Sequence, residues 1–457
     1  MDFNIHRGSS VNSAEHGASI QLSKREVNGL VTMKLVNENT FYLANLSVGS
    51  NSQNMGVLVD TGSSDLWVIG SDNSYCTGGI AKRDTSDDVD CSVYGTFDKS
   101  TSTSFKSNNT VFTTLYTDEM TASGEWGYDT VSIGSLTVEN MSIAVANMTD
   151  SSMGVLGIGL PGMETTYTSM SEEDAHMYEN FPMKLKSEGI IMKNIYSLYL
   201  NQESASYGTV LFGGVDHSKY IDRLITVPII NSYPDYLDNP VLIQVAYDSI
   251  SFEGKTLLHA SDTAILDSGS TISYLPSAVV NAAVSAMGMR YHKNIGAYAA
   301  SCNSFKDKSF NFTFDGADIT VPASNFLINF AGIPSSICGL GMMESDQTVF
   351  GDNFLRAAYV VYDLDDYEVS LANANFGESS NDEDVVAVVS TIPNARFGAS
   401  TGTSNTATTT RAGRASTSRS SSTKFSSLRN SGAGHIAFPE VLTIMGSVFC
   451  SALLLIL

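Results

Sequence analysis

Residues 57–64 read VLVDTGSS, and residues 264–271 read AILDSGST. Each segment is an apolar run that ends in Asp, a hydroxyl residue, Gly and two further hydroxyl residues. Each is also followed, much later in the chain, by two apolar residues and a glycine: VLG at residues 155–157 and VFG at residues 349–351. The chain therefore contains an internal duplication centred on Asp60 and Asp267.

The two copies share a set of residues that fit one chemistry. The residues that support the two acids are Thr61, Gly62 and Ser63 in the first copy and Ser268, Gly269 and Ser270 in the second. The glycines allow a tight turn and close backbone approach. We expect Ser63 and Ser270 to hydrogen-bond the outer carboxylate oxygens, and Thr61 and Ser268 to bond across to the opposite loop.

Two facing loops of this kind bring two carboxyl groups together. They cannot both ionise cheaply, so the pair keeps one proton over a wide acidic range. The ionised carboxylate then takes a proton from water while the protonated one polarises the scissile carbonyl. This predicts hydrolysis of peptide bonds by Asp60 and Asp267 with no metal, no cofactor and no covalent intermediate, and a pH optimum well below neutral. A single Asp-Thr-Gly usually marks a β-turn, but two copies with matching flanks favour the catalytic interpretation.

On these motifs the chain resembles the pepsin-like aspartic proteases, and within them the fungal yapsins. The resemblance spans residues 30–378 and includes Trp67 after the first copy, LFGGVD at residues 211–216 and GDNFLR at residues 351–356. It implies an all-β, bilobal fold with an active-site cleft between two β-barrel-like lobes, one catalytic Asp from each lobe, and polypeptide substrates. The many short apolar alternations separated by Gly, Asn and Ser agree with an all-β chain; residues 276–288 are the one moderate helix candidate.

The resemblance also implies a flap, a β-hairpin that closes over the cleft. GYDT at residues 127–130 matches the end of that hairpin, which makes Tyr116 the flap tyrosine. Its hydroxyl is expected to meet the Trp67 indole N–H. The flap carries Asp118 where polar, Gly-rich residues are common, and in yapsins a flap Asp is linked to cleavage at Lys or Arg. Asp118 is therefore the predicted specificity residue; the alternative is a solvated tip charge.

The cysteines and sequons indicate a secretory route. No Cys-x-x-Cys occurs, which argues against a zinc or dithiol site, and adjacency suggests the disulfides Cys76–Cys91 and Cys302–Cys338. The Asn-x-Ser/Thr triplets are at Asn45, Asn108, Asn140, Asn147 and Asn311. The acidic loop at residues 84–90 is best interpreted as a flexible charged loop near the mouth of the cleft; the alternative is that Lys82-Arg83 is a second processing site. We therefore expect a monomer, or two chains that stay associated after cleavage in this loop.

Charge divides the chain into two physical units. Of the 457 residues, 25 are Lys or Arg and 48 are Asp or Glu, giving a net charge of −23; such a chain repels phosphate backbones, so nucleic-acid binding is not expected. Between Asp384 and Glu440 there is no acid, and every charged residue is basic. The expected division is a propeptide remnant at residues 1–25, an N-terminal lobe at 26–194, a C-terminal lobe at 195–378, a stalk at 379–432 and a removed anchor signal at 433–457.

Both ends of the chain carry processing signals. The dibasic Lys24-Arg25 precedes the first strand-like segment and predicts propeptide cleavage after Arg25. Residues 400–427 are rich in Ser and Thr with almost nothing apolar, which is typical of an extended, O-glycosylated stalk. The apolar run at residues 441–457 fits a glycosylphosphatidylinositol (GPI) signal better than a transmembrane helix, with Asn430 the expected attachment site and Ser431 or Gly432 next. This predicts a protein on the outer face of the plasma membrane or in the cell wall, joined to the membrane through a GPI lipid.

Two other classes of function compete with the protease. A non-catalytic relative could bind peptides in a dead cleft, but both Asp residues and both glycines are present. A structural cell-wall mannoprotein would explain the stalk and anchor signal but not the duplicated Asp loops. The metalloprotease motif His-Glu-x-x-His does not occur. The Gly-x-Ser-x-Gly pattern of many serine hydrolases occurs once, at residues 398–402, where the Ser/Thr-rich stretch begins.

Overall fold

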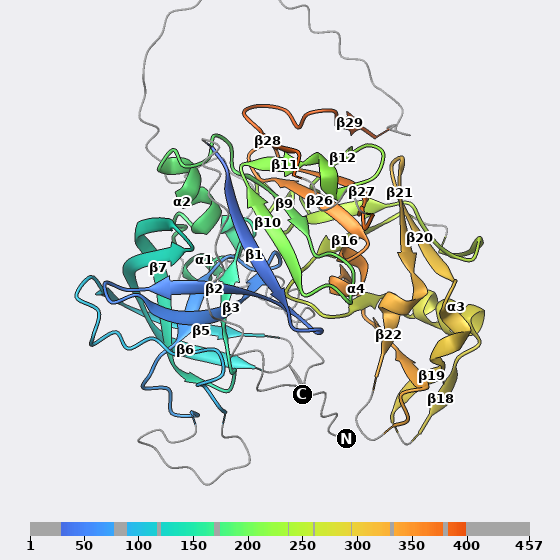
Figure 1. Cartoon of the computed structure of the whole chain (residues 1–457), viewed down its shortest axis with the longest axis horizontal. Helices are drawn as coiled ribbons and strands as arrows, with labels where there is room; N and C mark the ends of the chain where they lie inside the picture. Colours follow the sequence, from blue (N-terminus) through green and yellow to red (C-terminus); the bar gives the residue numbers. More distant parts are fainter. Residues whose placement is uncertain are drawn as a thin grey trace, which may run out of the picture.

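The computed structural model describes residues 29–76, 89–116, 120–168, 174–235, 237–258, 261–293, 295–329, 333–377 and 383–398. Two strand-rich lobes lie on either side of a central sheet (Figure 1). The all-β, bilobal pepsin-like fold is confirmed. Within the described ranges no helix is long and apolar enough to cross a membrane.

The N-terminal lobe is built from eight strands and short helices. Its strands are β1 (Val31–Asn37), β2 (Tyr42–Val48), β3 (Gln53–Asp60), β4 (Leu66–Ile69), β5 (Lys106–Leu115), β6 (Thr121–Ile133), β7 (Leu136–Thr149) and β8 (Gly154–Gly157). The helices are the 3-10 helix η2 (Pro161–Met163), α1 (Thr165–Thr168) and α2 (Phe181–Ser187). The long strands β5, β6 and β7 form an antiparallel meander, and β6 also pairs with β2.

The C-terminal lobe consists of three smaller sheets. Its strands are β13 (Gln244–Tyr247), β14 (Ser249–Phe252), β15 (Lys255–Leu258), β16 (Asp262–Leu266), β17 (Ser273–Leu275), β18 (Arg290–His292), β19 (Ala297–Ser301), β20 (Ser309–Phe314), β21 (Ala317–Pro322), β22 (Leu327–Ile328), β23 (Ile337–Leu340), β24 (Met342–Glu344) and β25 (Thr348–Phe350). In β20 every second residue is buried, which places Phe310, Phe312 and Phe314 in the core. The predicted helix is confirmed as α3 (Ser277–Met287), which begins after Pro276 and ends at Gly288, whose φ is +68°. Two 3-10 helices, η4 (Cys302–Phe305) and η5 (Ala323–Phe326), and the short α4 (Asp352–Leu355) complete this lobe.

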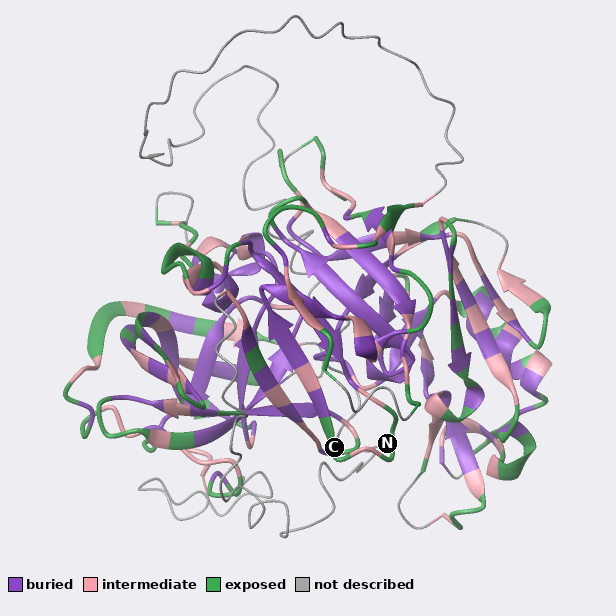
Figure 2. Cartoon of the chain, turned by 45° about the horizontal axis from the view of Figure 1, so that its top comes forward, coloured by how far each residue is buried: buried purple, intermediate pink, exposed green. Residues whose placement is uncertain are grey.

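A central group of strands forms one 14-stranded sheet with the strands of the N-terminal lobe. It contains β9 (Ile195–Tyr199), β10 (Tyr207–Phe212), β12 (Ile225–Pro228), β26 (Ala358–Asp363) and β27 (Glu368–Asn373); β11 (Gly214–Asp216) and η3 (His217–Lys219) lie beside it in the chain. Strand β1 pairs with β10 on one side and β2 on the other, so the N-terminal lobe is hydrogen-bonded directly to this sheet. The buried strands of the centre are visible in Figure 2, and a single apolar core contains residues of both lobes.

Folded structure extends past the predicted lobe boundary at residue 378. Residues 383–398, which we assigned to the stalk, form β28 (Val385–Ala387) and β29 (Arg396–Phe397). Strand β28 pairs with β11, and β29 pairs with β12. Val388 and Ile392 are buried in a cluster with residues of the central sheet. The apolar residues of this segment therefore anchor it to the C-terminal lobe, and the described fold ends at Gly398.

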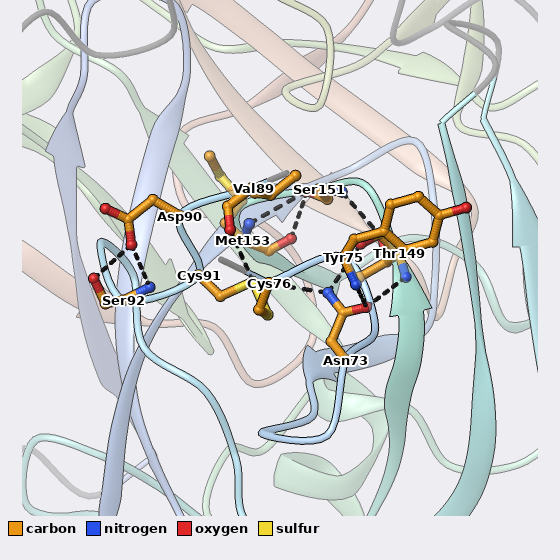
Figure 3. Close-up of a disulfide and its surroundings, with 10 residues drawn as sticks. All are labelled: Asn73, Tyr75, Cys76, Val89, Asp90, Cys91, Ser92, Thr149, Ser151 and Met153. Carbon is orange, nitrogen blue, oxygen red and sulfur yellow. Dashed lines mark hydrogen bonds between the residues drawn. A yellow bond between two sulfur atoms is a disulfide. The ribbon is translucent and has the colours of Figure 1, made fainter. Parts of the chain in front are cut away.

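Both predicted disulfides are confirmed. Cys76–Cys91 closes the base of a loop beside Asn73, whose amide group bonds the backbone of Thr149 (Figure 3). Cys302–Cys338 lies in the C-terminal lobe. Of the five sequon asparagines, Asn45, Asn108, Asn140 and Asn147 are exposed, and Asn311 in β20 is half-buried. Several predicted features lie outside the described residues: the pair Lys24-Arg25, Lys82-Arg83 with the loop at residues 84–90, the stalk from residue 400 onward, Asn430 and the terminal apolar run. Of that loop, only Val89 and Asp90 are described.

Candidate active site

The duplicated sequences form two loops of the same construction. Strand β3 ends at Asp60 and pairs in parallel with β8, so that Asp60 faces Gly157 in the register. Strand β16 leads directly to Asp267 and pairs in parallel with β25, which ends one residue before Gly351. A side chain at Gly157 would collide with the Ser64 backbone at 2.5 Å, and one at Gly351 with the Ile272 carbonyl at 2.3 Å. The downstream glycines of the repeat therefore let each Asp loop fold against its neighbouring strand.

Four hydrogen bonds join the two loops across the lobes. The Thr61 hydroxyl donates to the Leu266 carbonyl at 2.8 Å, and the Ser268 N–H donates to the Thr61 hydroxyl at 2.9 Å. In the same way the Ser268 hydroxyl donates to the Val59 carbonyl at 2.8 Å, and the Thr61 N–H donates to the Ser268 hydroxyl at 3.2 Å. The bonds expected between the loops are thus present, and they are reciprocal and buried.

The two carboxyl groups meet at the centre of this arrangement. Asp60 is buried at the end of β3, and Asp267 is fully buried. A Cβ atom on Gly269 would lie 2.5 Å from Oδ1 of Asp60 and 3.1 Å from Oδ1 of Asp267. A Cβ atom on Gly62 would lie 2.7 Å from Oδ1 of Asp267. Each glycine therefore makes room for the carboxyl group of the opposite lobe.

The hydrogen-bond donors around the two acids are unequal. Asp60 accepts from the Gly62 N–H at 2.7 Å and from the Ser63 hydroxyl at 2.5 Å. Asp267 accepts from the Gly269 N–H at 2.8 Å, but its Oδ2 has no hydrogen-bond partner in the described part of the chain. The expectation for Ser270 was wrong, because its hydroxyl donates to the Ile272 carbonyl at 2.9 Å instead of to Asp267.

This asymmetry affects where the shared proton resides. Burial raises the pKa of Asp267 well above its ordinary value, and the charge of Asp60 raises it further. Two donors stabilise a charged carboxylate at Asp60, whereas Asp267 has one. The raised pKa of Asp267 and its single donor fit a carboxyl group that keeps a proton.

A third buried acid, Asp352, lies near the pair and was missed as a site residue. Both of its carboxyl oxygens are buried without a hydrogen-bond partner among the described residues. Burial raises its pKa well above the ordinary value; Arg356 opposes this, and the Asp60 charge adds to it. Arg356 in turn donates to the Tyr42 hydroxyl at 3.0 Å and to the Asn39 carbonyl in the N-terminal lobe. Both acid and arginine belong to the GDNFLR segment, so the motif was visible although its role was not.

The flap tyrosine is where the resemblance placed it. The Trp67 indole N–H donates to the Tyr116 hydroxyl at 2.7 Å, and the two rings lie 6.4 Å apart. The Tyr116 N–H donates to the Met120 carbonyl at 2.9 Å, which closes the hairpin between β5 and β6. Asp118 lies outside the described residues.

Comparisons with known proteins agree with this site. The family model described as eukaryotic aspartyl protease matches residues 41–374. The chain is 37% identical over 442 residues to aspartic proteinase 3 of Saccharomyces cerevisiae, covering 82% of this chain and 76% of that protein. It is 40% identical over 391 residues to aspartic proteinase yapsin-3 of the same yeast, covering 83% and 75%. It is 34% identical over 471 residues to secreted aspartic protease 9 of Candida albicans, covering 82% and 85%.

Proposed function

The chain belongs to the eukaryotic aspartyl proteases and is an aspartic endopeptidase, and from this premise we propose that Asp60 is its general base and Asp267 its general acid. The observation that carries this assignment is the unequal set of donors around the two carboxyl groups. Asp60 is stabilised as an anion, and Asp267 holds the shared proton.

The proposed reaction moves two protons in each half. Asp60 takes a proton from water as the water oxygen bonds to the scissile carbonyl carbon, and Asp267 gives its proton to the carbonyl oxygen, which forms a neutral tetrahedral diol. Asp60 then returns its proton to the amide nitrogen, the C–N bond breaks, and one hydroxyl of the diol returns a proton to Asp267. The bonds through Thr61 and Ser268 hold the two carboxyl groups at the spacing this requires. We expect activity to be highest well below neutral pH.

The matched serines test the assignment of base and acid. Replacing Ser63 with Ala removes a donor to the Asp60 carboxylate, so the acidic limb of kcat/KM should move to higher pH by about half a unit or more. Replacing Ser270 with Ala leaves both carboxyl groups with their donors and should leave that limb in place. Equal shifts in the two variants, or a shift in the Ser270 variant alone, would reverse the assignment.

Catalysis itself is tested by the Asp267→Asn variant. A peptide library digested at pH 4 should be cleaved by the wild-type protein and not by the variant, and a statine-type peptide should inhibit the wild type. Cleavage by the variant at the wild-type rate would exclude the proposed dyad.

We further propose that Asp118 favours Lys or Arg beside the scissile bond. A carboxylate at the tip of the flap would face a bound substrate and attract a cationic side chain. The similarity to yapsins supports this proposal. The Asp118→Ala variant should lose its preference for basic over apolar P1 peptides while it still cleaves the apolar ones; an unchanged preference would exclude this role.

The cellular role we propose is the processing or shedding of surface and secreted proteins. Relatives named secreted aspartic proteases support a secreted or cell-surface location. Cleavage after Arg25, N-glycosylation at the five sequons and a GPI anchor at Asn430 complete this proposal. The anchor can be tested with a phosphatidylinositol-specific phospholipase, which should release the wild-type protein from intact cells. The enzyme should release no protein from cells that express a variant in which Asn430, Ser431 and Gly432 are all replaced.

A further inference from the structure

A second pair of acids is buried in the N-terminal lobe, apart from the catalytic pair. Asp65 lies in the loop between β3 and β4, and Glu164 lies between η2 and α1 with no exposed surface. Asp65 accepts from the Thr165 N–H at 2.9 Å and from the Tyr178 hydroxyl at 2.7 Å. Glu164 accepts from the Tyr178 N–H at 2.7 Å. Tyr178 therefore bonds to both acids at once, one through its side chain and one through its backbone.

Glu164 stays uncharged in this place. Burial, and secondarily the charge of Asp65, raises its pKa to about 10. Burial also raises the pKa of Asp65. Among the described residues no cation contributes to the environment of either carboxyl group. One oxygen of Glu164, Oε1, is buried without a hydrogen-bond partner in the same part of the chain, which a neutral acid tolerates better than an anion.

The groups that face Glu164 come from three elements. The catalytic loop contributes Asp65, and the segment at residues 174–180 contributes Tyr178. On the adjoining helix α1, Tyr167 is titratable, and burial raises its pKa. The remaining titratable side chains of the segment are those of Asp174, His176 and Glu179, and all three are exposed. Among the described residues, a charge on Glu164 would therefore meet the acid Asp65 and the phenol of Tyr178.

The ring of Tyr178 connects this pair to the flap. It packs edge-on against Trp126 with ring centres 5.3 Å apart, and Trp126 packs against Phe112 at 5.4 Å. Phe112 lies 6.2 Å from Trp67, whose indole N–H is bonded to the Tyr116 hydroxyl. These rings belong to one buried cluster that is separate from the main core. A change at Tyr178 can thus be transmitted through packed side chains to the flap tyrosine.

We propose that Glu164 and Tyr178 are positioning residues for the flap, a role that rests on the proposed protease function. Neutral Glu164 and the hydroxyl of Tyr178 fix residues 174–180 to the catalytic loop. The fixed ring of Tyr178 then supports Trp126 and Trp67 beneath the flap. Ionisation of Glu164 would place a second negative charge beside Asp65 and weaken this support, so the flap would be held best at acidic pH.

The direction of the pH effect follows from linkage. Because the pKa of Glu164 is higher in the folded protein than in an unfolded chain, its arrangement is most favourable below the unfolded value, about 4.3, and loses free energy as the pH rises toward 10. The free energy of opening the segment at residues 174–180 depends on pH in the same way. Flap support should therefore weaken through the neutral range.

The test uses the two tryptophans of the chain, Trp67 and Trp126, which both belong to the connecting rings. Their emission should change as the pH of the wild-type protein is raised from 4 toward 10. In the Glu164→Gln variant, which keeps a neutral side chain, the midpoint of this change should move up by at least one pH unit, with kcat/KM at pH 4 within about threefold of wild type. The exposed Glu179→Gln variant, on the same segment, should behave as wild type.

A second variant covers the case in which Glu164→Gln does not fold. Tyr178→Phe keeps the ring but removes the bond to Asp65, and it should raise KM for peptides at pH 4 by threefold or more, with a smaller effect on kcat. An unchanged emission midpoint in folded Glu164→Gln, or unchanged emission and KM in Tyr178→Phe, would overturn the proposal. The emission series can also be measured in an Asp267→Asn background, so it decides the positioning role even if the wild-type protein cleaves no peptide.

Discussion

The bonds between the two Asp loops predict a measurable coupling between the lobes. The informative change is Thr61→Val, which keeps the shape of the side chain and removes its hydroxyl. The variant leaves the Leu266 carbonyl and the Ser268 N–H buried without their partner. Each buried polar group left unsatisfied costs about 1–3 kcal/mol, so the free energy of unfolding should fall by about 2–6 kcal/mol.

The same change should affect catalysis. The carboxyl group of Asp60 directly precedes Thr61, and a displacement of about 1 Å at a reacting group can cost about a hundredfold in rate. We expect kcat at pH 4 to fall by about tenfold or more. Thr226→Val is a matched control, because its buried hydroxyl bonds Ser370 at 2.7 Å within the central sheet, away from the loops. It should lose stability with little change in kcat.

A double-mutant cycle isolates the link itself. The Thr61 N–H donates to the Ser268 hydroxyl, and the Ser268 N–H donates to the Thr61 hydroxyl. Urea unfolding at pH 4 of Thr61→Val, Ser268→Ala and the double variant should give a coupling energy of about 1 kcal/mol or more. If Thr61→Val keeps the wild-type kcat and unfolding midpoint, the loops are not held together by these bonds; losses that simply add would show that the two hydroxyls act independently.

Three further predictions concern other buried groups. Burial raises the pKa of Asp352, so its contribution to stability is fully present below about pH 4 and is lost as the pH rises. The urea midpoint of Asp352→Asn should therefore be higher than that of the wild type at pH 7 but not at pH 4. An equal difference between the two proteins at both pH values would contradict this. Lys193→Met leaves Asp363 buried without its cation, which should cost about 3–5 kcal/mol in urea unfolding, and a loss under 1 kcal/mol would refute it. Removing Cys302–Cys338, whose cysteines are 36 residues apart, should cost about 4 kcal/mol by loop entropy, measured against wild type in the same assay; no loss would show that the reduced chain stays restrained there.

The catalytic loops could be predicted because their chemistry is local. Asp-(Thr/Ser)-Gly-Ser places the acid, the turn and the donors within four residues. Because the pattern occurs twice, each copy also indicates which loop it pairs with. The disulfides could be predicted for a similar reason, since each pair is close in sequence. Helix α3 was marked at both ends, by Pro276 and Gly288.

What the sequence did not reveal depends on distant packing. Glu164 is a single acid in an unremarkable stretch, and its environment is created by Asp65 and Tyr178 from other segments. The segment at residues 383–398 contains the apolar run VVAVV at 385–389, but it follows polar residues and precedes the Ser/Thr-rich stretch, so it was assigned to the stalk and its apolar residues were not interpreted as strands. They form strands because β11 and β12 offer them unpaired edges and a buried cluster.

The unequal dyad shows how a duplicated sequence can acquire two roles. Ser63 and Ser270 occupy equivalent places in the two loops, and one donates to its Asp while the other donates to the Ile272 carbonyl. In the second loop the chain continues through Ser270 into β17, and the Asp352 N–H already binds the Ser270 carbonyl at 2.7 Å. Under the proposed assignment the surroundings of each loop would decide where the shared proton resides, because serines at matching positions of the two loops make different bonds.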